Sequence, residues 1–258
     1  RRAVARFCGR LPGTTGLAGY VVCCVLPCRC CWKGLEKTLR FGKDSKHEDG
    51  EPLVKCNVGT RKVLVLGLDG SGKSSWLWLC DHPEDSSLRS GELLQPTSGV
   101  QRLTRKHVRS SVGEETNVSV DLELTEVGGG EQIRPFWGHY VAQDLAVLVF
   151  FADASDSDRL EEAAEALAEV CRAVVAQAKA PSARLLLVAM NTFAVGAEPS
   201  SDIHEVMRRA AEDVVAFDGV RILEADLVGA AGREPADALL SHVADLALGA
   251  GPPLRWRR

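Results

Sequence analysis

The chain has 258 residues, of which 45% are hydrophobic and 26% are charged, and its formal net charge is −4. This length suits one α/β domain of about 170–200 residues with an extension. The near balance of charge argues against a generally basic surface, so we expect no nucleic-acid partner. Of the nine cysteines, only Cys56, Cys80 and Cys171 lie beyond residue 50. The domain therefore has no disulfide framework, which is typical of cytoplasmic proteins.

Residues 1–56 are predicted to form an N-terminal extension. Its first ten residues contain four arginines and no acid, and an apolar run at 17–26 leads into a cysteine-rich stretch. The run is shorter than the about twenty apolar residues that span a bilayer. Three interpretations stay open: a marginal membrane segment over residues 17–32 with cysteines as palmitoylation candidates, a metal-binding tract, or a non-native start. The first places the protein on the cytoplasmic face of a membrane.

The stretch from residue 62 to residue 78, KVLVLGLDGSGKSSWLW, is the centre of the domain. An apolar strand pattern precedes the glycines and a helix pattern follows them, and residues 67–74 fit G-x-x-x-x-G-K-[ST] in full. Glycines let backbone N–H groups turn toward a phosphate, and the helix N-terminus favours negative charge. The predicted nucleotide contacts in this loop are Gly67, Leu68, Asp69, Gly70, Ser71, Gly72, Lys73, Ser74 and Ser75.

Strand and helix patterns alternate along the rest of the domain, which we place at residues 57–250. Further strands are predicted at 101–104, 118–124, 145–151, 184–190 and 220–223, and helices from Ser74 to about residue 82 and at 159–179, 202–217 and 234–248. Residues 106–115 are predicted to be a basic turn, and the basic tail 251–258 a disordered end. This order predicts an α/β fold with a doubly wound, mostly parallel six-stranded sheet, one antiparallel strand, and helices on both faces.

Three stretches, at residues 67–74, 96–99 and 127–140, together resemble the ADP-ribosylation-factor (Arf) and Arf-like small GTPases. The third contains a double glycine followed by I-R-P-x-W, which is the most specific of the three. The resemblance covers about residues 60–248. It implies a P-loop NTPase fold, GTP or GDP with Mg²⁺ as ligands, and a monomer. It also implies that effector proteins bind the two switch segments and the interswitch hairpin between them.

The resemblance assigns roles to individual residues. Lys73 would bind the β- and γ-phosphates, and Ser74 would ligate Mg²⁺. Thr97 matches the switch I threonine that senses the γ-phosphate through Mg²⁺, although an ordinary loop threonine is the alternative. Gly129 matches the switch II glycine whose N–H meets the γ-phosphate. Asn191 matches the first residue of the N-K-x-D motif that reads guanine.

Two departures concern Mg²⁺ and hydrolysis. Glu126 stands where the family has aspartate, and we expect it to hold Mg²⁺ through water, less well than the shorter side chain. Gly130 stands where the family has the glutamine that orients the attacking water. We therefore assign no catalytic residue and expect very slow hydrolysis.

A third departure concerns the base. Thr192 and Ala194 replace the lysine and aspartate of N-K-x-D. The aspartate would make two charge-assisted hydrogen bonds to guanine, so its loss costs about 3–6 kcal/mol, or about 10²–10⁴ in affinity. Asp202 or Asp226 could compensate.

Three functions stay open. The first is an Arf-like GTP-binding switch or scaffold on a membrane, acting in trafficking or signalling. The second is a pseudo-GTPase that uses the fold as an interaction module, with little or base-unselective nucleotide binding. The third is a membrane GTPase subunit that resembles the signal-recognition-particle receptor β-subunit. Whether the protein is an enzyme depends on which of these holds.

Overall fold

The computed structural model describes residues 56–82, 97–109, 118–176, 183–216, 220–227, 233–249 and 255–256. All of them belong to one compact unit, residues 52–258. The extension at residues 1–55, with its predicted apolar and cysteine-rich segment, lies outside the described residues. None of the described helices is long and apolar enough to cross a membrane.

One sheet of six strands is the framework of this unit, in the order β2, β3, β1, β4, β5, β7. The strands are β1 (Cys56–Gly67), β2 (Val100–Arg109), β3 (Val118–Val127), β4 (Leu145–Asp153), β5 (Arg184–Met190) and β7 (Arg221–Ala225). All neighbours pair parallel except β2 and β3, which form an antiparallel pair at one edge. The predicted sheet, with its single antiparallel strand, is confirmed.

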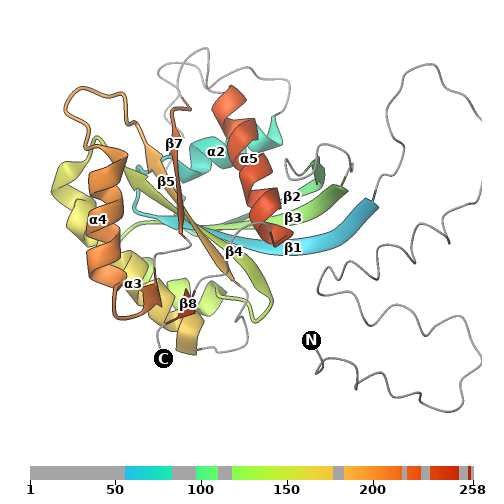
Figure 1. Cartoon of the computed structure of the whole chain (residues 1–258), viewed down its shortest axis with the longest axis horizontal. Helices are drawn as coiled ribbons and strands as arrows, with labels where there is room; N and C mark the ends of the chain where they lie inside the picture. The colour runs from blue at the N-terminus through green and yellow to red at the C-terminus, as the bar shows by residue number, and fades with distance from the viewer. Residues whose placement is uncertain are drawn as a thin grey trace, which may run out of the picture. The chain divides into compact units, whose positions relative to one another are not determined.

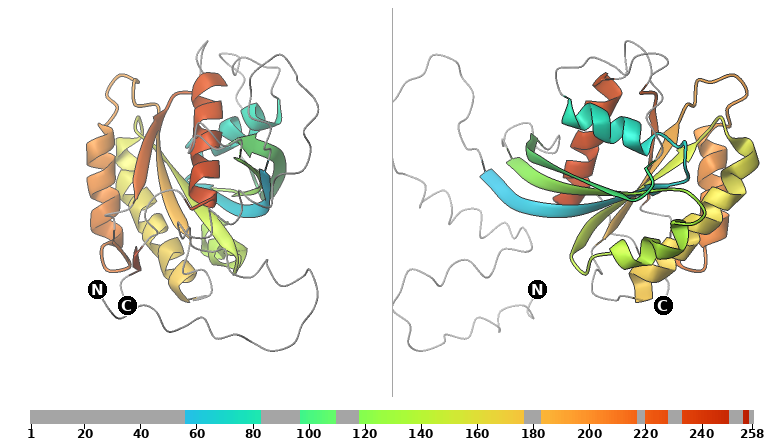
Figure 2. Two further views of the ribbon diagram at one scale, coloured as in Figure 1. Left: turned by 45° about the vertical axis from the view of Figure 1, so that its right-hand side comes forward. Right: turned by 180° about the vertical axis from the view of Figure 1, so that it is seen from behind.

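Helices cover both faces of the sheet, as Figures 1 and 2 show from three directions. Helices α2 (Lys73–Asp81) and α5 (Arg233–Ala247) lie on one face, and α3 (Leu160–Ala176) and α4 (Ser200–Ala211) lie on the other. Two short 3₁₀ helices, η1 (Arg134–Tyr140) and η2 (Ser157–Arg159), precede strand β4 and helix α3.

Each face of the sheet has its own hydrophobic core. Along β1, Leu64 and Leu66 pack toward α3 and α4, whereas Val63 and Val65 pack toward α2 and α5. Because side chains alternate along a strand, a strand buried on both faces must be apolar at every position. This is why the sequence pattern of the central strands was a continuous apolar run.

Trp76 and Trp78 lie two residues apart in α2 and face different surroundings. Trp76 is fully buried, and its indole Nε1 donates a hydrogen bond to the carbonyl of Ala236 at 3.2 Å, which joins α2 to α5. Trp78 is half-buried and stacks on the imidazole of His82. Residues two apart cannot share one face of a helix, so the division follows from helix geometry.

Several predicted boundaries were wrong. The predicted turn at 106–115 begins inside β2, because β2 continues to Arg109 and, after an irregularity between Arg105 and Val108, still pairs with β3. The predicted helix 202–217 ends at Ala211, and Val215–Ala216 instead form strand β6. This strand pairs antiparallel with β8 (Arg255–Trp256), which lies in the tail that we predicted to be disordered. The last two corrections come from one pairing between segments distant in sequence, which local patterns do not reveal.

Candidate functional site

The glycine-rich loop connects the end of β1 at Gly67 to the start of α2 at Lys73. A Cβ atom at Gly67 would lie 2.4 Å from the carbonyl oxygen of Phe151. Gly72 has φ +87°, and a Cβ there would lie 2.8 Å from the terminal methyl of Met190. Only glycine fits this left-handed, closely packed backbone. The loop therefore holds its shape at the carboxyl end of a central strand, where α/β sheets bind ligands.

The side chain of Lys73 is enclosed by this loop, with only 4% of its surface exposed. Its ammonium Nζ donates hydrogen bonds to the carbonyl of Leu68 at 2.6 Å and to the hydroxyl of Ser71 at 3.3 Å. Burial lowers the pKa of Lys73 to about 8, partly offset by the negative charges of Glu126 and Asp69. A buried cation in this position is suited to phosphate oxygens, whose negative charge would compensate for the lost hydration.

Ser74, Thr97 and Glu126 meet beside the lysine. The Ser74 hydroxyl lies 2.6 Å from Oε1 of Glu126 and 3.0 Å from the Thr97 hydroxyl, which in turn lies 3.1 Å from the same Oε1. Glu126 is fully buried, and its other oxygen, Oε2, has no hydrogen-bond partner among the described residues. The structure thus brings together all three predicted metal ligands, from α2, switch I and β3.

This triangle of oxygens fits Mg²⁺. Octahedral Mg²⁺ has ligand oxygens at about 2.0–2.1 Å, so adjacent ligands lie about 2.8–3.0 Å apart. The three oxygens hydrogen-bond to one another at 2.6, 3.0 and 3.1 Å, so they lie close enough together to share one cation. That a water molecule joins Glu126 to Mg²⁺ stays a prediction. Bound Mg²⁺ would neutralise charge on the phosphates. Among the described residues no three His, Cys, Asp or Glu side chains form a metal-binding group, as expected for a set with one carboxylate.

Gly128 and Gly129, at the start of the predicted switch II, are held against the phosphate loop and against Gly99, two residues after Thr97 of the predicted switch I. The Gly128 N–H donates to the carbonyl of Gly99 at 2.9 Å, and the Trp137 indole donates to the carbonyl of Gly128 at 2.9 Å. A Cβ at Gly129 would lie 2.3 Å from the amide nitrogen of Asp69. The predicted switch II glycine therefore lies directly beside the phosphate loop.

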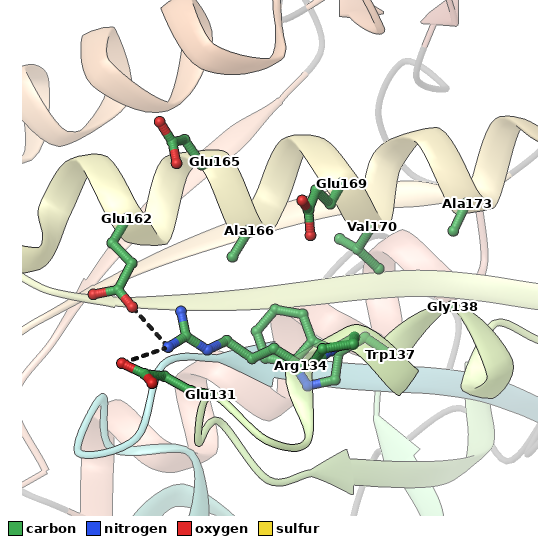
Figure 3. A pocket seen from close by; sticks show the side chains of 11 residues that line it. Glu131, Arg134, Trp137, Gly138, Glu162, Glu165, Ala166, Glu169, Val170 and Ala173 are labelled. Atoms are coloured by element: carbon green, nitrogen blue, oxygen red, sulfur yellow. Dashed lines mark ion pairs between the residues drawn. The ribbon is translucent and has the colours of Figure 1, made fainter.

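Two ion pairs that the sequence did not predict connect this region to η2 and α3. Arg159 binds the Asp69 carboxylate at 3.1 Å. Arg134 binds Glu162 at 2.6 Å, and Figure 3 shows this second pair. Each arginine is more than twenty residues from its partner in the sequence, so no spacing rule could have paired them. Their effect is to fix the phosphate loop and η1 to the same helical segment.

Residues 191–194, the segment expected to bind the base, lack the charged side chains that line the phosphate part of the site. Asn191 adopts φ +57°, and its side-chain amide donates to Oδ1 of Asp153 at 3.0 Å. Ala194 is exposed, and the Thr192 hydroxyl is buried without a partner among the described residues. The Asn191 N–H donates to the carbonyl of Ala225 at 3.3 Å. Asp226 is the next residue after Ala225, so this candidate acid lies close to Asn191. Asp202 lies instead in the exposed first turn of α4.

A cavity of about 590 Å³ lies over the phosphate loop and the two switches. The predicted site residues that line it are Asp69, Gly70, Lys73, Ser74, Thr97, Glu126 and Gly129. Asn191 does not line this cavity. The phosphate and Mg²⁺ parts of the predicted site are therefore assembled in one place. Asn191 also adjoins the phosphate loop, because the preceding Met190 packs against Gly72, and Asp153, to which Asn191 donates, lines a smaller pocket together with Asp69 and Ser71.

The fold and this site define a phosphate-loop nucleotide-binding protein of the small-GTPase kind. The model of the ADP-ribosylation factor family matches residues 54–225, so the chain belongs to that family.

Individual relatives agree with this assignment. The chain is 33% identical to ADP-ribosylation factor-like protein 1 of Saccharomyces cerevisiae over 110 residues, which are 41% of this chain and about half of that protein. It is 28% identical to ADP-ribosylation factor-like protein 3 of the same yeast over 60% of this chain and 72% of that protein. The signal recognition particle receptor SRb-GTP/SRX complex of Chaetomium thermophilum shares the fold, with TM-score 0.56 and 16% identity over 72% of this chain and 97% of that one.

Proposed function

We propose that this protein is an Arf-like molecular switch or scaffold that binds GTP or GDP with Mg²⁺, hydrolyses GTP very slowly and acts at a membrane. The observation that carries this proposal is the triangle of Ser74, Thr97 and Glu126 beside the buried Lys73. These residues come from the phosphate loop and from both predicted switches. A nucleotide bound there would hold both switches in one arrangement, and its loss would release them.

Each residue has a distinct task in this mechanism. Lys73 would balance the charge of the β- and γ-phosphates, and the backbone N–H of Gly129 would meet the γ-phosphate. Ser74, Thr97 and Glu126 would hold a Mg²⁺ ion, which would neutralise negative charge on the phosphates. No side chain at position 130 can orient a water molecule, so the bound state would persist until the nucleotide dissociates. Exposed Phe136 on η1 would belong to the surface that effector proteins contact.

The direct test is to titrate fluorescent GTP, GDP and ATP into the full chain with Mg²⁺. Selective binding of the guanine nucleotides supports the switch. Equal binding of GTP and ATP would mean that the site reads phosphate without reading the base. No binding to the folded protein would contradict the switch and favour the second candidate, an interaction module without nucleotide. The loss of the guanine-reading aspartate at Ala194 is the observation that favours this second candidate.

We expect Gly130→Gln to raise the rate of GTP hydrolysis by about tenfold or more, because a glutamine there can position the attacking water. The position accepts a side chain, since a Cβ at Gly130 would meet no atom within 4 Å. Single-turnover hydrolysis by the full chain measures the effect. The matched control is Gly129→Ala, whose Cβ would collide with the phosphate loop and which should weaken nucleotide binding instead. An unchanged rate in Gly130→Gln would mean that more than the glutamine is missing.

We expect Glu126→Gln to weaken Mg²⁺-dependent nucleotide binding about tenfold or more, because the variant keeps the shape of the side chain but removes the only carboxylate of the triangle. Nucleotide dissociation measured with and without EDTA reports this directly. EDTA should accelerate dissociation from the original protein and have little further effect on the variant. Glu123→Gln, in the same strand but outside the triangle, is the control. An EDTA effect that is equal in both variants would remove Glu126 from the metal site.

A further inference from the structure

A second cavity, of about 340 Å³, lies between η1 and α3, and we call it the η1–α3 groove. Figure 3 shows η1 along one side and one face of α3 along the other. Its floor is apolar and consists of Trp137 and Gly138 from η1 and Ala166, Val170 and Ala173 from α3. A Cβ at Gly138 would lie 3.3 Å from the Ala173 methyl, so the two elements approach closely at this end.

The rim of the groove is acidic. Glu162, Glu165 and Glu169 of α3 line the groove, and Glu131 lies opposite them before η1. In Figure 3 Glu162 points toward η1, and Glu165 stands at the outer edge of α3. Arg134 pairs with Glu162 at 2.6 Å and lies 4.0 Å from Glu131. Glu165 and Glu169 are exposed and have no ion pair or hydrogen bond among the described residues. They therefore leave two negative charges on the rim that make no ion pair among the described residues, and the one basic residue of α3 is Arg172, three residues after Glu169.

The spacing of these two acids destabilises helix α3. Glu165 and Glu169 are four residues apart, so they lie on one ridge of α3 about 6 Å apart and repel each other. A lysine or arginine at either position would have stabilised the helix instead. A cationic partner that binds across the ridge would remove this repulsion.

We propose that the η1–α3 groove docks a basic amphipathic helix of a partner protein. Lysine or arginine side chains at positions i and i+4 of that helix match the spacing of Glu165 and Glu169. Their aliphatic stems, and the small apolar residues beside them, fit the floor formed by Ala166 and Val170. The charge of the rim selects a cationic protein segment and disfavours an anionic lipid surface.

The groove and the nucleotide cavity share three lining residues, Glu131, Arg134 and Glu162. A cation presented to Glu162 would compete with Arg134 and so alter how η1 is held. If the proposed nucleotide switch operates, the partner helix and the nucleotide must then affect each other's affinity by the same factor. Only this coupling rests on the proposed function; docking itself does not.

The probe is a synthetic 16-residue leucine/lysine helix with lysines at i and i+4 and a benzophenone on its apolar face, added to the full chain without nucleotide. We expect saturable binding by fluorescence anisotropy and photo-crosslinks confined to η1 and residues 162–173 of α3. A peptide with glutamates in place of the lysines should not bind. Crosslinks on other surfaces would overturn the proposal.

The matched variants separate specific docking from general charge attraction. Glu165→Lys with Glu169→Lys should weaken binding at least about tenfold, and the two glutamine replacements should have a smaller effect in the same direction. The control, Asp213→Lys with Glu234→Lys, changes the net charge equally outside the groove and should change the affinity less than twofold. Equal weakening by both lysine pairs would overturn the proposal. Because nucleotide is absent, a failure here is distinct from a failure to bind GTP.

Discussion

Ala194→Asp is expected to raise the preference of the protein for GTP over ATP by about 10²–10⁴. The new carboxylate would accept two hydrogen bonds from the guanine edge, each worth about 1.5–3 kcal/mol. The backbone is ready for it, because Ala194 is exposed and its N–H donates to the carbonyl of Asn191 at 3.0 Å, which fixes the loop. Competition between labelled GTP and unlabelled ATP measures the ratio, and adding Thr192→Lys should raise it further.

Val195→Asp is the matched control for this gain of function. Val195 is the next residue and is completely exposed, so the substitution adds the same charge to the same loop. It should leave the nucleotide preference unchanged. A GTP/ATP ratio that stays within about threefold of the original in Ala194→Asp would mean that the base does not lie against residues 191–194. Asp226, beside the Ala225 carbonyl that binds Asn191, would then be the next candidate for guanine contact.

The fold was predictable because each of its signals is local. The apolar runs at 145–151 and 184–190 became β4 and β5 with shifts of two residues or fewer, and the glycine spacing located the turn between β1 and α2. What could not be predicted depends on pairing across the chain. Strand β6 was assigned to the end of a helix because its partner β8 lies about forty residues away.

The site divides in the same way. Lys73 and Ser74 follow from one contiguous motif, and Thr97 and Glu126 follow from resemblance to a family. Their mutual distances come only from the structure. The ion pair between Arg134 and Glu162 could not be predicted, since a charge on a solvent-facing helix has many potential partners. These contacts nevertheless determine how switch II is held and where the groove lies.

Lys73→Met is expected to abolish tight nucleotide binding and to stabilise the nucleotide-free protein. The variant lacks the ammonium charge that would face the β- and γ-phosphates, and this loss should weaken GTP binding by about 10²–10⁴. Burial lowers the pKa of Lys73 from 10.5 to about 8, a shift of about 2.5. At about 1.4 kcal/mol for each unit, keeping this ammonium charged at pH 7 costs up to about 3 kcal/mol of folding free energy. Methionine avoids that cost but loses the hydrogen bonds to Leu68 and Ser71, so we expect a gain of about 1–2 kcal/mol.

The pH dependence gives this prediction a sharper test. Between pH 8 and 10.5 the unfolded chain holds a proton on Lys73 that the folded protein has released, so the free energy of unfolding of the original protein should rise with pH in this window. Lys73→Met should lack that rise, so its advantage should shrink with pH and reverse as the pH approaches 10.5, where the original protein keeps the hydrogen bonds to Leu68 and Ser71. Urea unfolding at a series of pH values measures it, with Lys62→Met, whose lysine pairs with Asp144 at the surface, as the control. If the difference in free energy of unfolding between the two proteins stays constant across this window, burial does not disfavour the charged form of Lys73. Lys73 would then cost the fold no stability, and the proposal that its charge is kept buried in order to bind phosphate would fail.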